Sequence, residues 1–368
     1  MTTSRRTARS AESSAEGAPV VHPSVGPTDS ILDVPGLRVG QVEIGPMPST
    51  AAGSTGVTAI VAPAGALGAV DVRGAAPGTR ETDTLSVLTS GEQVHAILLV
   101  GRSVFGLAAT DGATAELERR GIGLPVDCED LHLTIPIVAA AVVFDFAHGD
   151  PAVRPGPDDG ARAVAAALDG SGGRPRSGNA GAGVGAITGG IVPPRLKGGV
   201  GHASLVAPLE TGGLVVGAIV VLNSSGGVID PASNEPWAIA GRFGDAGPLP
   251  DLSPIASSLA HTTLAVVGTN ARLSKAQLGR VAAMAHDGMA RAIRPVHTGV
   301  DGDVVFALAA GSSTEPLVDV LSGDRDWAPA AATIVGSLAA DALTRAILDA
   351  IRSAEPSGGF EAFSGGGA

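Results

Sequence analysis

Short apolar runs rich in β-branched residues and longer Ala-rich segments of helical periodicity follow one another in blocks along this chain. The β-branched runs predict buried strands at 56–65, 65–74, 94–101, 202–208, 214–223, 262–269 and 303–309, and the first two are expected to pair with each other. The Ala-rich segments predict helices at 105–121, 158–170, 275–294 and 326–354. Because strands and helices do not alternate strictly, the sequence favours an α+β fold in which helices cover sheets.

The chain is expected to form one domain between two tails. Residues 1–30 are rich in Ser, Ala and Pro, and they lack apolar periodicity, which predicts a disordered N-terminal tail. The Gly-rich end of the chain predicts a flexible tail at 355–368. The catalytic or binding domain is therefore expected at 31–354.

Composition narrows the classes of partner. The net charge of −12 provides no basic stripe for phosphates, so a nucleic-acid partner is not expected. No apolar run reaches the ~18 residues that a membrane helix needs. The single cysteine, Cys128, is typical of a chain without an intrachain disulfide, and it predicts a cytoplasmic location. Arg5 and Arg6 are not followed by an apolar segment, so an export signal is not expected.

Two adjacent threonines, Thr262 and Thr263, open an apolar run in the last third of the chain. Such a pair is often no more than the start of a strand. A threonine hydroxyl can also act as a nucleophile when a base lies beside it, and the nearest base available to it is its own freed α-amine. That role would require the chain to be cut between His261 and Thr262.

Asp301 and Asp303 flank Gly302 directly before the apolar run at 304–309. Two acids around a glycine usually form a solvated turn. In this apolar context they would repel each other unless a cation or a shared proton lay between them, so they could instead hold a hydroxyl or an ammonium group.

Other motifs carry weaker signals. The glycine-rich stretch at 181–186 follows no predicted strand, so tight turns or pocket-lining amides are expected there and not a dinucleotide loop. Ser103 stands in a strand–turn–helix context, but the spacing of its glycines departs from that of a serine-hydrolase elbow; a helix cap is the plainer interpretation. The histidines do not have metal-ligand spacing. Neither a metal nor another cofactor is expected.

Eight motifs, taken together and in order, resemble the L-aminopeptidase/D-esterase-amidase family, which also contains the endo-type nylon-oligomer hydrolase. The motifs lie between about residue 30 and residue 312. They are DVPGLRVGQ (33–41), VDVRGAAPGTRETD (70–83), FGLAATDG (105–112), GAGVGA (181–186), LKGGVGHAS (196–204), VGAIVVLNSSGGVIDP (216–231), TTLAVVGTNARLSKAQ (262–277) and AHDGMARAIRPVHTGVDGDVVFALA (285–309).

The resemblance implies an αββα sandwich of the N-terminal-nucleophile-hydrolase type, which cuts itself into 1–261 and 262–368. It assigns the nucleophile to Thr262, the oxyanion-stabilising amide to Asn223, and the acid pair to Asp301 and Asp303. It also implies a homo-oligomer, with a tetramer of cleaved heterodimers expected. The substrate would be a small peptide or an amide oligomer.

Two positions depart from the family. The residue before the cut, Asn or Gly in relatives, is His261, and a lysine of the nylon-hydrolase branch falls on Gly190. Lys197, in the LKGG motif, is the nearest replacement. A buried Lys197 would titrate below its usual range and could relay the proton of the nucleophile.

The residues themselves leave three functions open. The first is an amide hydrolase that acts through an acyl-Thr intermediate. Its base would be the α-amine, with a pKa of ~7.7–8.0. Asn223 would donate a hydrogen bond to the oxyanion. The second is an acyltransferase of the ornithine acetyltransferase type, which would pass the same acyl group to an amine. The third is an uncleaved ligand-binding protein.

Overall fold

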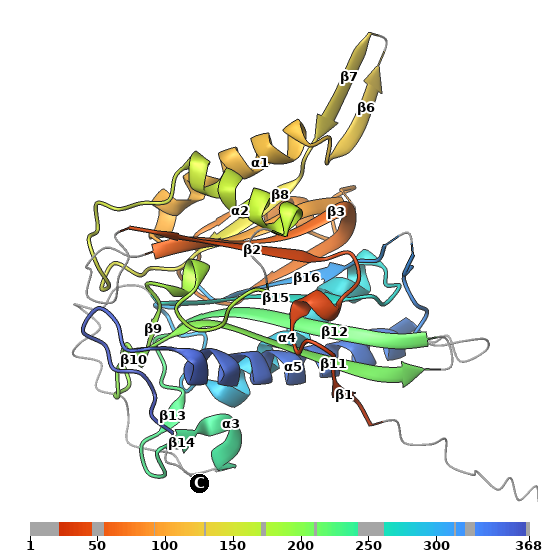
Figure 1. The fold of residues 1–368 in the computed structure, drawn as a ribbon. Helices are drawn as coiled ribbons and strands as arrows, with labels where there is room; N and C mark the ends of the chain where they lie inside the picture. Colours follow the sequence, from red (N-terminus) through yellow and green to blue (C-terminus); the bar gives the residue numbers. More distant parts are fainter. Residues whose placement is uncertain are drawn as a thin grey trace, which may run out of the picture.

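A computed structural model describes residues 22–45, 55–91, 93–128, 130–170, 174–209, 212–241, 261–312, 314–320 and 328–365. Four layers stack in the order helices, sheet, sheet, helices (Figure 1). The αββα sandwich expected from the sequence is therefore confirmed. The outer layers are α1 (Ala109–Arg119) with α2 (Pro157–Asp169), and α4 (Lys275–Ala292) with α5 (Ala328–Ser353).

The two inner layers form one continuous hydrogen-bonded sheet in the order β1-β11-β12-β15-β16-β3-β5-β8-β4, with β2 also paired to β3. Its strands are β1 (Ser24–Val25), β2 (Arg38–Ile44), β3 (Thr55–Val72), β4 (Thr79–Arg80), β5 (Gln93–Val100), β8 (Val138–Val142), β11 (Gly199–Leu209), β12 (Gly212–Asn223), β15 (Thr262–Thr269) and β16 (Val304–Ala309). Smaller elements are β6 (Leu124–Cys128), β7 (Leu131–Ile135), β9 (Ile187–Thr188), β10 (Leu196–Lys197), β13 (Ile229–Asp230), β14 (Glu235–Pro236), α3 (Trp237–Ala240), and the 3-10 turns η1 (Ile31–Asp33), η2 (Asp83–Leu85), η3 (Ser103–Ala108) and η4 (Gly181–Gly183).

Strand β3 connects the two layers, and here one prediction was wrong. The runs at 56–65 and 65–74 do not pair with each other, because they form one strand of 18 residues. Its first half pairs with β2 and β5, and its second half pairs with β16. Gly65 adopts a φ of +76°, and the register with β5 shifts between Val61 and Ala66, so the chain bends from one layer into the other without reversing.

Alternation along the strands divides the core into three apolar layers. Val266 and Phe306 point into the space between the two sheets, whereas their neighbours Ala265 and Val305 point toward α4 and α5. Leu98 of β5 faces α1 and α2. Because successive side chains of a strand lie on opposite faces, strands buried on both faces must be apolar throughout. This explains the continuous β-branched runs.

The helices begin and pack as their sequences require. The Ser274 hydroxyl accepts a hydrogen bond from the Gln277 N–H, and the Ser274 N–H donates to the Gln277 side-chain oxygen, so the two residues form a capping box at the start of α4. In α5, Pro329–Ser353 is long and apolar enough to cross a membrane, but most of this segment is buried inside the protein. It contributes to the apolar cluster that α4, β11 and β12 also form, so we describe it as a core helix.

Both ends of the predicted domain extend further than the sequence indicated. Residues 1–21 lie outside the described part, but 22–30 already belong to the fold, since β1 pairs with β11 and Ser30 caps η1. At the other end, where a flexible tail was predicted, Glu355 exchanges hydrogen bonds with Asn179, and the Glu361 carbonyl accepts one from the Lys197 backbone. Residues 355–365 therefore lie along the body of the protein.

Candidate active site

Four of the predicted site residues meet where three strands come together. Thr262 is the first residue of β15, and its register partner on antiparallel β12 is Asn223, the last residue of that strand. β16 runs parallel to β15, so the segment that precedes it, with Asp301 and Asp303, arrives at the same edge. All four residues are buried. The topology thus unites residues that are far apart in sequence.

The peptide bond between His261 and Thr262 is held in extended conformation. His261 forms a parallel bridge with Asp301: its N–H donates to the Val300 carbonyl (3.4 Å), and its own carbonyl accepts from the Gly302 N–H (2.9 Å). A Cβ on Gly302 would lie 2.7 Å from Thr262 Oγ1, so only glycine allows the hydroxyl to lie against this backbone. The carbonyl next to the hydroxyl is therefore already polarised by a donor.

The ring of His261 lies against Gly190, and this contact connects the two departures from the family. A Cβ on Gly190 would lie 2.0 Å from His261 Nε2, so the ring fills the space that a side chain at 190 would need. Burial, with a smaller contribution from the charge of Arg195, lowers the pKa of His261 to about 4. The ring is therefore neutral near pH 7.

Asp303 holds the backbone beside Thr262. Its Oδ1 accepts the Thr263 N–H at 2.7 Å, and its Oδ2 accepts the His297 N–H at 3.1 Å. The ring nitrogen Nδ1 of His297 lies 2.8 Å from the same Oδ2. A carboxylate accepts all these bonds without rearrangement, whereas an amide would turn a donor toward a donor.

Asp301 fixes the neighbouring loops. Its Oδ1 accepts the Ser225 N–H at 3.1 Å, and its Oδ2 accepts the N–H and the hydroxyl of Thr298 at 3.0 and 2.6 Å. Burial and the nearby charge of Asp303 raise the pKa of Asp301. Each acid is only 1% exposed, which rules out the solvated turn. Among the described residues neither carboxylate bonds to Thr262 itself.

Asn223 has a fixed orientation. Its Oδ1 accepts the Ile187 N–H at 3.0 Å, and its Nδ2 donates to the Phe144 carbonyl at 3.2 Å. An amide nitrogen carries two hydrogens, so one remains for a substrate atom. Because both ends of the amide are anchored, that second hydrogen has a defined direction.

Lys197 lies one step behind this amide. Its Nζ donates to the carbonyls of Gly183, Ala186 and Gly198 at 2.9, 2.7 and 2.9 Å, which matches the three hydrogens of an ammonium group. Burial lowers the pKa of Lys197 to about 7, and the charge of Asp145 opposes this shift. Lys197 has no hydrogen bond to Thr262 in the part that the structure describes. It holds Ala186, while Asn223 holds the adjoining Ile187.

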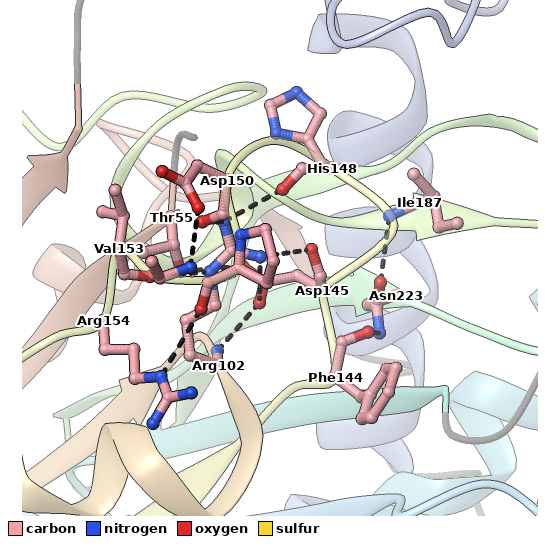
Figure 2. A network of polar contacts seen from close by, with 12 residues as sticks. Thr55, Arg102, Phe144, Asp145, His148, Asp150, Val153, Arg154, Ile187 and Asn223 are labelled. Carbon is pink, nitrogen blue, oxygen red and sulfur yellow. Dashed lines mark hydrogen bonds and ion pairs between the residues drawn. The ribbon is translucent and has the colours of Figure 1, made fainter. Parts of the chain in front are cut away.

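A second network, which the sequence analysis missed, supports Asn223 from the other side (Figure 2). The fully buried guanidinium of Arg102 donates to four carbonyls of one loop, those of Asp145, His148, Asp150 and Val153. This loop begins at Phe144, whose carbonyl is the acceptor for Asn223. In the sequence, this network is indicated only by two charged residues, Arg102 and Asp145, each of which follows a buried apolar run.

The Asp145 carboxylate completes this network. It accepts bonds from the Arg102 N–H (2.8 Å) and the Thr55 hydroxyl (2.7 Å), and its Oδ1 lies 3.5 Å from Nη1 of Arg102. Burial raises the pKa of Asp145, whereas Arg102 and Thr55 act in the opposite direction. A buried charge with this many donors is tolerated only in a fixed geometry.

The remaining motifs are structural. The stretch at 181–186 forms the tight turn η4, as expected, and supplies two of the carbonyls that hold Lys197. Ser103 does not cap a helix: it is the first residue of η3, and the residue before it, Arg102, makes no side-chain cap. Among the described residues there is no group of three His, Cys, Asp or Glu side chains placed to hold a metal.

Residues 29–363 match the family model of peptidase family S58. The chain belongs to this family. It is 42% identical over 355 residues to an uncharacterized aminopeptidase of Mycobacterium leprae, covering 92% of this chain and 94% of that protein. It is 30% identical over 333 residues to a 6-aminohexanoate-oligomer endohydrolase of Paenarthrobacter ureafaciens, covering 87% and 85%. The resemblance is confirmed, and the family supports a hydrolase that acts on amide bonds.

Solved structures agree on the fold. A β-aminopeptidase of Burkholderia sp. superposes with a TM-score of 0.67 at 22% identity, covering 94% of this chain and 93% of that one. The L-aminopeptidase D-Ala-esterase/amidase of Ochrobactrum anthropi, described as a variant of the N-terminal-nucleophile hydrolase fold, gives 0.65 at 23% identity, covering 91% and 89%.

Replacement of Lys197 by Met should change how stability depends on pH. The folded-state pKa of about 7 lies below the ordinary 10.5, so between these values the unfolded chain binds more protons and the free energy of unfolding of the wild type should rise with pH. The slope from this group is at most about 1.4 kcal/mol per pH unit. Urea denaturation of both proteins at pH 7, 8 and 9 measures this slope. If the free energies of unfolding of wild type and variant differ by the same amount at all three pH values, the pKa of Lys197 is not lowered.

Proposed function

We propose that the protein is a self-processing N-terminal-nucleophile amide hydrolase that cuts its own chain between His261 and Thr262 and then acts through an acyl-Thr262 intermediate. The observation that supports this most directly is the hydrogen bond from the Gly302 N–H to the His261 carbonyl, next to a hydroxyl that lies against the same glycine.

The maturation step follows from this geometry. Thr262 Oγ1 attacks the His261 carbonyl carbon, and Gly302 N–H stabilises the oxyanion. The C–N bond then breaks, its nitrogen takes up the hydroxyl proton, and the acyl group becomes an ester on Oγ1. Water hydrolyses this ester, which leaves a carboxylate on His261 and a free α-amine on Thr262.

The same atoms then hydrolyse a substrate. The new α-amine, with an ordinary pKa of ~7.7–8.0, takes the proton of Oγ1 as it attacks the substrate carbonyl. The substrate C–N bond then breaks, the amine gives this proton to the leaving nitrogen, and water hydrolyses the ester that remains on Oγ1. The Gly302 N–H again faces the attacked carbonyl, and Asn223 Nδ2 donates its second hydrogen to the developing oxyanion. Asp303 and Asp301 favour the charged form of the amine and fix the backbone around it. Lys197 acts on this site by positioning the segment that Asn223 also holds.

The substrates we propose are small peptides, amino-acid amides or linear amide oligomers, in line with the names of the relatives. A cytoplasmic location and a tetramer of cleaved heterodimers remain part of the proposal. The cytoplasmic location is supported by Cys128, a free, exposed thiol at the end of β6, because thiols stay reduced in the cytoplasm.

Maturation gives the first test. Purified protein should separate on a denaturing gel into fragments 1–261 and 262–368, and N-terminal sequencing of the smaller one should begin Thr-Thr-Leu-Ala. Thr262→Ala should remain whole because it has no nucleophile, whereas Thr263→Ala keeps the hydroxyl of Thr262 and should still be cut. Cleavage at another bond, or an active enzyme whose chain stays intact, would refute the assignment of Thr262.

Asn223→Ala should lower kcat by roughly 10²–10³-fold, with a smaller effect on KM, because it removes an oxyanion donor. Asn223→Asp is the matched variant: it keeps the acceptor for the Ile187 N–H, but it loses the donor and adds a negative charge. It should be at least as impaired. Steady-state kinetics on an aminoacyl p-nitroanilide measures both. If kcat of Asn223→Ala stays within a few-fold of the wild type, Asn223 is not the oxyanion donor, and the Gly302 N–H is then the main one.

Asp303→Asn should slow self-cleavage more than Asp301→Asn. Asp303 holds the Thr263 N–H directly beside the nucleophile, and the amide of asparagine would turn its NH₂ toward the N–H of Thr263 or of His297. Asp301 acts through Ser225 and Thr298. We expect both variants to keep their circular dichroism spectra and Asp303→Asn to lose most hydrolysis. The measurement is the rate of appearance of the two fragments, and unchanged rates in both folded variants would remove the acid pair from the mechanism.

A further inference from the structure

We propose that the ring of His261 marks the pocket for the side chain of the substrate's acyl residue, and that Gly190 determines the size of that pocket. The inference rests on the proposed function, because it requires Thr262 to attack the His261 carbonyl first and the substrate carbonyl afterwards. Gly190 then acts as a specificity-determining residue, and His261 of the uncut chain is a substrate analogue built into the protein.

The attacked carbons in the two reactions must occupy nearly the same place. Oγ1 of Thr262 is the nucleophile in both, and the Gly302 N–H, in the segment directly before β16, lies beside it in both. An acyl group on Oγ1 therefore directs its side chain where His261 directs its ring. After the cut, His261 ends its own fragment and can leave this position to the substrate.

The His261 ring lies closest to the place that a side chain at 190 would take. The three atoms nearest to a Cβ at 190 are Nε2, Cε1 and Cδ2 of His261, and all belong to the imidazole. The φ of Gly190 lies outside the left-handed region, so the backbone itself would accept alanine. Because Gly190 has no side chain, the imidazole ring of His261 can occupy the space beside its backbone.

The pocket is suited to a neutral side chain. His261 is 4% exposed, and its Nδ1 has no hydrogen-bond partner among the described residues. Burial and the charge of Arg195 disfavour the protonated ring. The described residues therefore offer no partner for a polar atom at the Nδ1 position, and the charge of Arg195 disfavours a second positive charge, which favours a phenylalanyl or neutral histidyl amide over a lysyl amide. The unsatisfied Nδ1 also favours departure of the ring once the bond is cut.

The first experiment measures self-cleavage. Gly190→Ala should mature slowly or not at all, because the new methyl group overlaps the His261 ring. The double variant Gly190→Ala/His261→Ala should mature at the rate of His261→Ala, and Gly299→Ala, whose Cβ would meet nothing within 4 Å, provides the control for a glycine replaced close to the site. If Gly190→Ala alone matures at the wild-type rate, the proposal is overturned.

The second experiment measures substrate choice in matured enzyme. His261→Ala and the double variant are compared on alanyl, phenylalanyl, histidyl and lysyl p-nitroanilides. The added methyl should lower kcat/KM for the phenylalanyl and histidyl substrates by about 10-fold or more, and for the alanyl substrate by less than about 3-fold. His261→Gly, used as a second background, should give the same ratios.

The outcomes separate the two proposals. An equal loss on all substrates, or no loss, would overturn the pocket while leaving the hydrolase intact. Matured enzyme that hydrolyses neither these four amides nor a linear 6-aminohexanoate oligomer would instead contradict the proposed function, and this inference would fall with it.

Discussion

The pairing of β12, β15 and β16 around the 261–262 peptide is the constraint on which the site depends. Antiparallel register puts Asn223 opposite Thr262, and parallel register puts Asp301 opposite His261. A slip of one residue in either pair would turn Thr262 to the other face of the sheet. Such a slip would be costly because β15 is buried on both faces and its two faces carry side chains of different size, with Val266 between the sheets and Ala265 against α4 and α5. The core that stabilises the fold therefore also sets the geometry of the site.

Two buried cations hold the irregular segments that the sheet does not reach. Arg102 and Lys197 are both fully buried, and most of their donors are directed at backbone carbonyls. Burying a charge is costly unless its hydrogen-bonding capacity is met, so each cation stabilises only one arrangement of its loop. One loop presents the Phe144 carbonyl and the other the Ile187 N–H, and Asn223 lies between them. Rigidity at this amide thus comes from charges that do not touch a substrate.

The sequence predicted the local features of the site better than its long-range ones. Thr262 at a strand start, Asn223 at a strand end and the helix that begins at Lys275 all follow from the apolar periodicity of the sequence. The bend of β3 was missed because a glycine between two β-branched runs is equally typical of a hairpin. The Arg102 network and the contact of His261 with Gly190 join residues more than 40 positions apart. No local pattern encodes such contacts, and only the packed chain reveals them.

The electrostatics of the uncut chain give a reason for the cut to proceed. Asp301 and Asp303 lie close enough for one charge to raise the pKa of the other acid, and Lys197 is held by carbonyls elsewhere. Under the proposed maturation the reaction turns a neutral peptide nitrogen into an amine beside these two acids. That amine can take up a proton and compensate their repulsion. The hydrogen bonds of the two acids are already made in the uncut chain, so what maturation would add is a positive charge that lowers the repulsion between them.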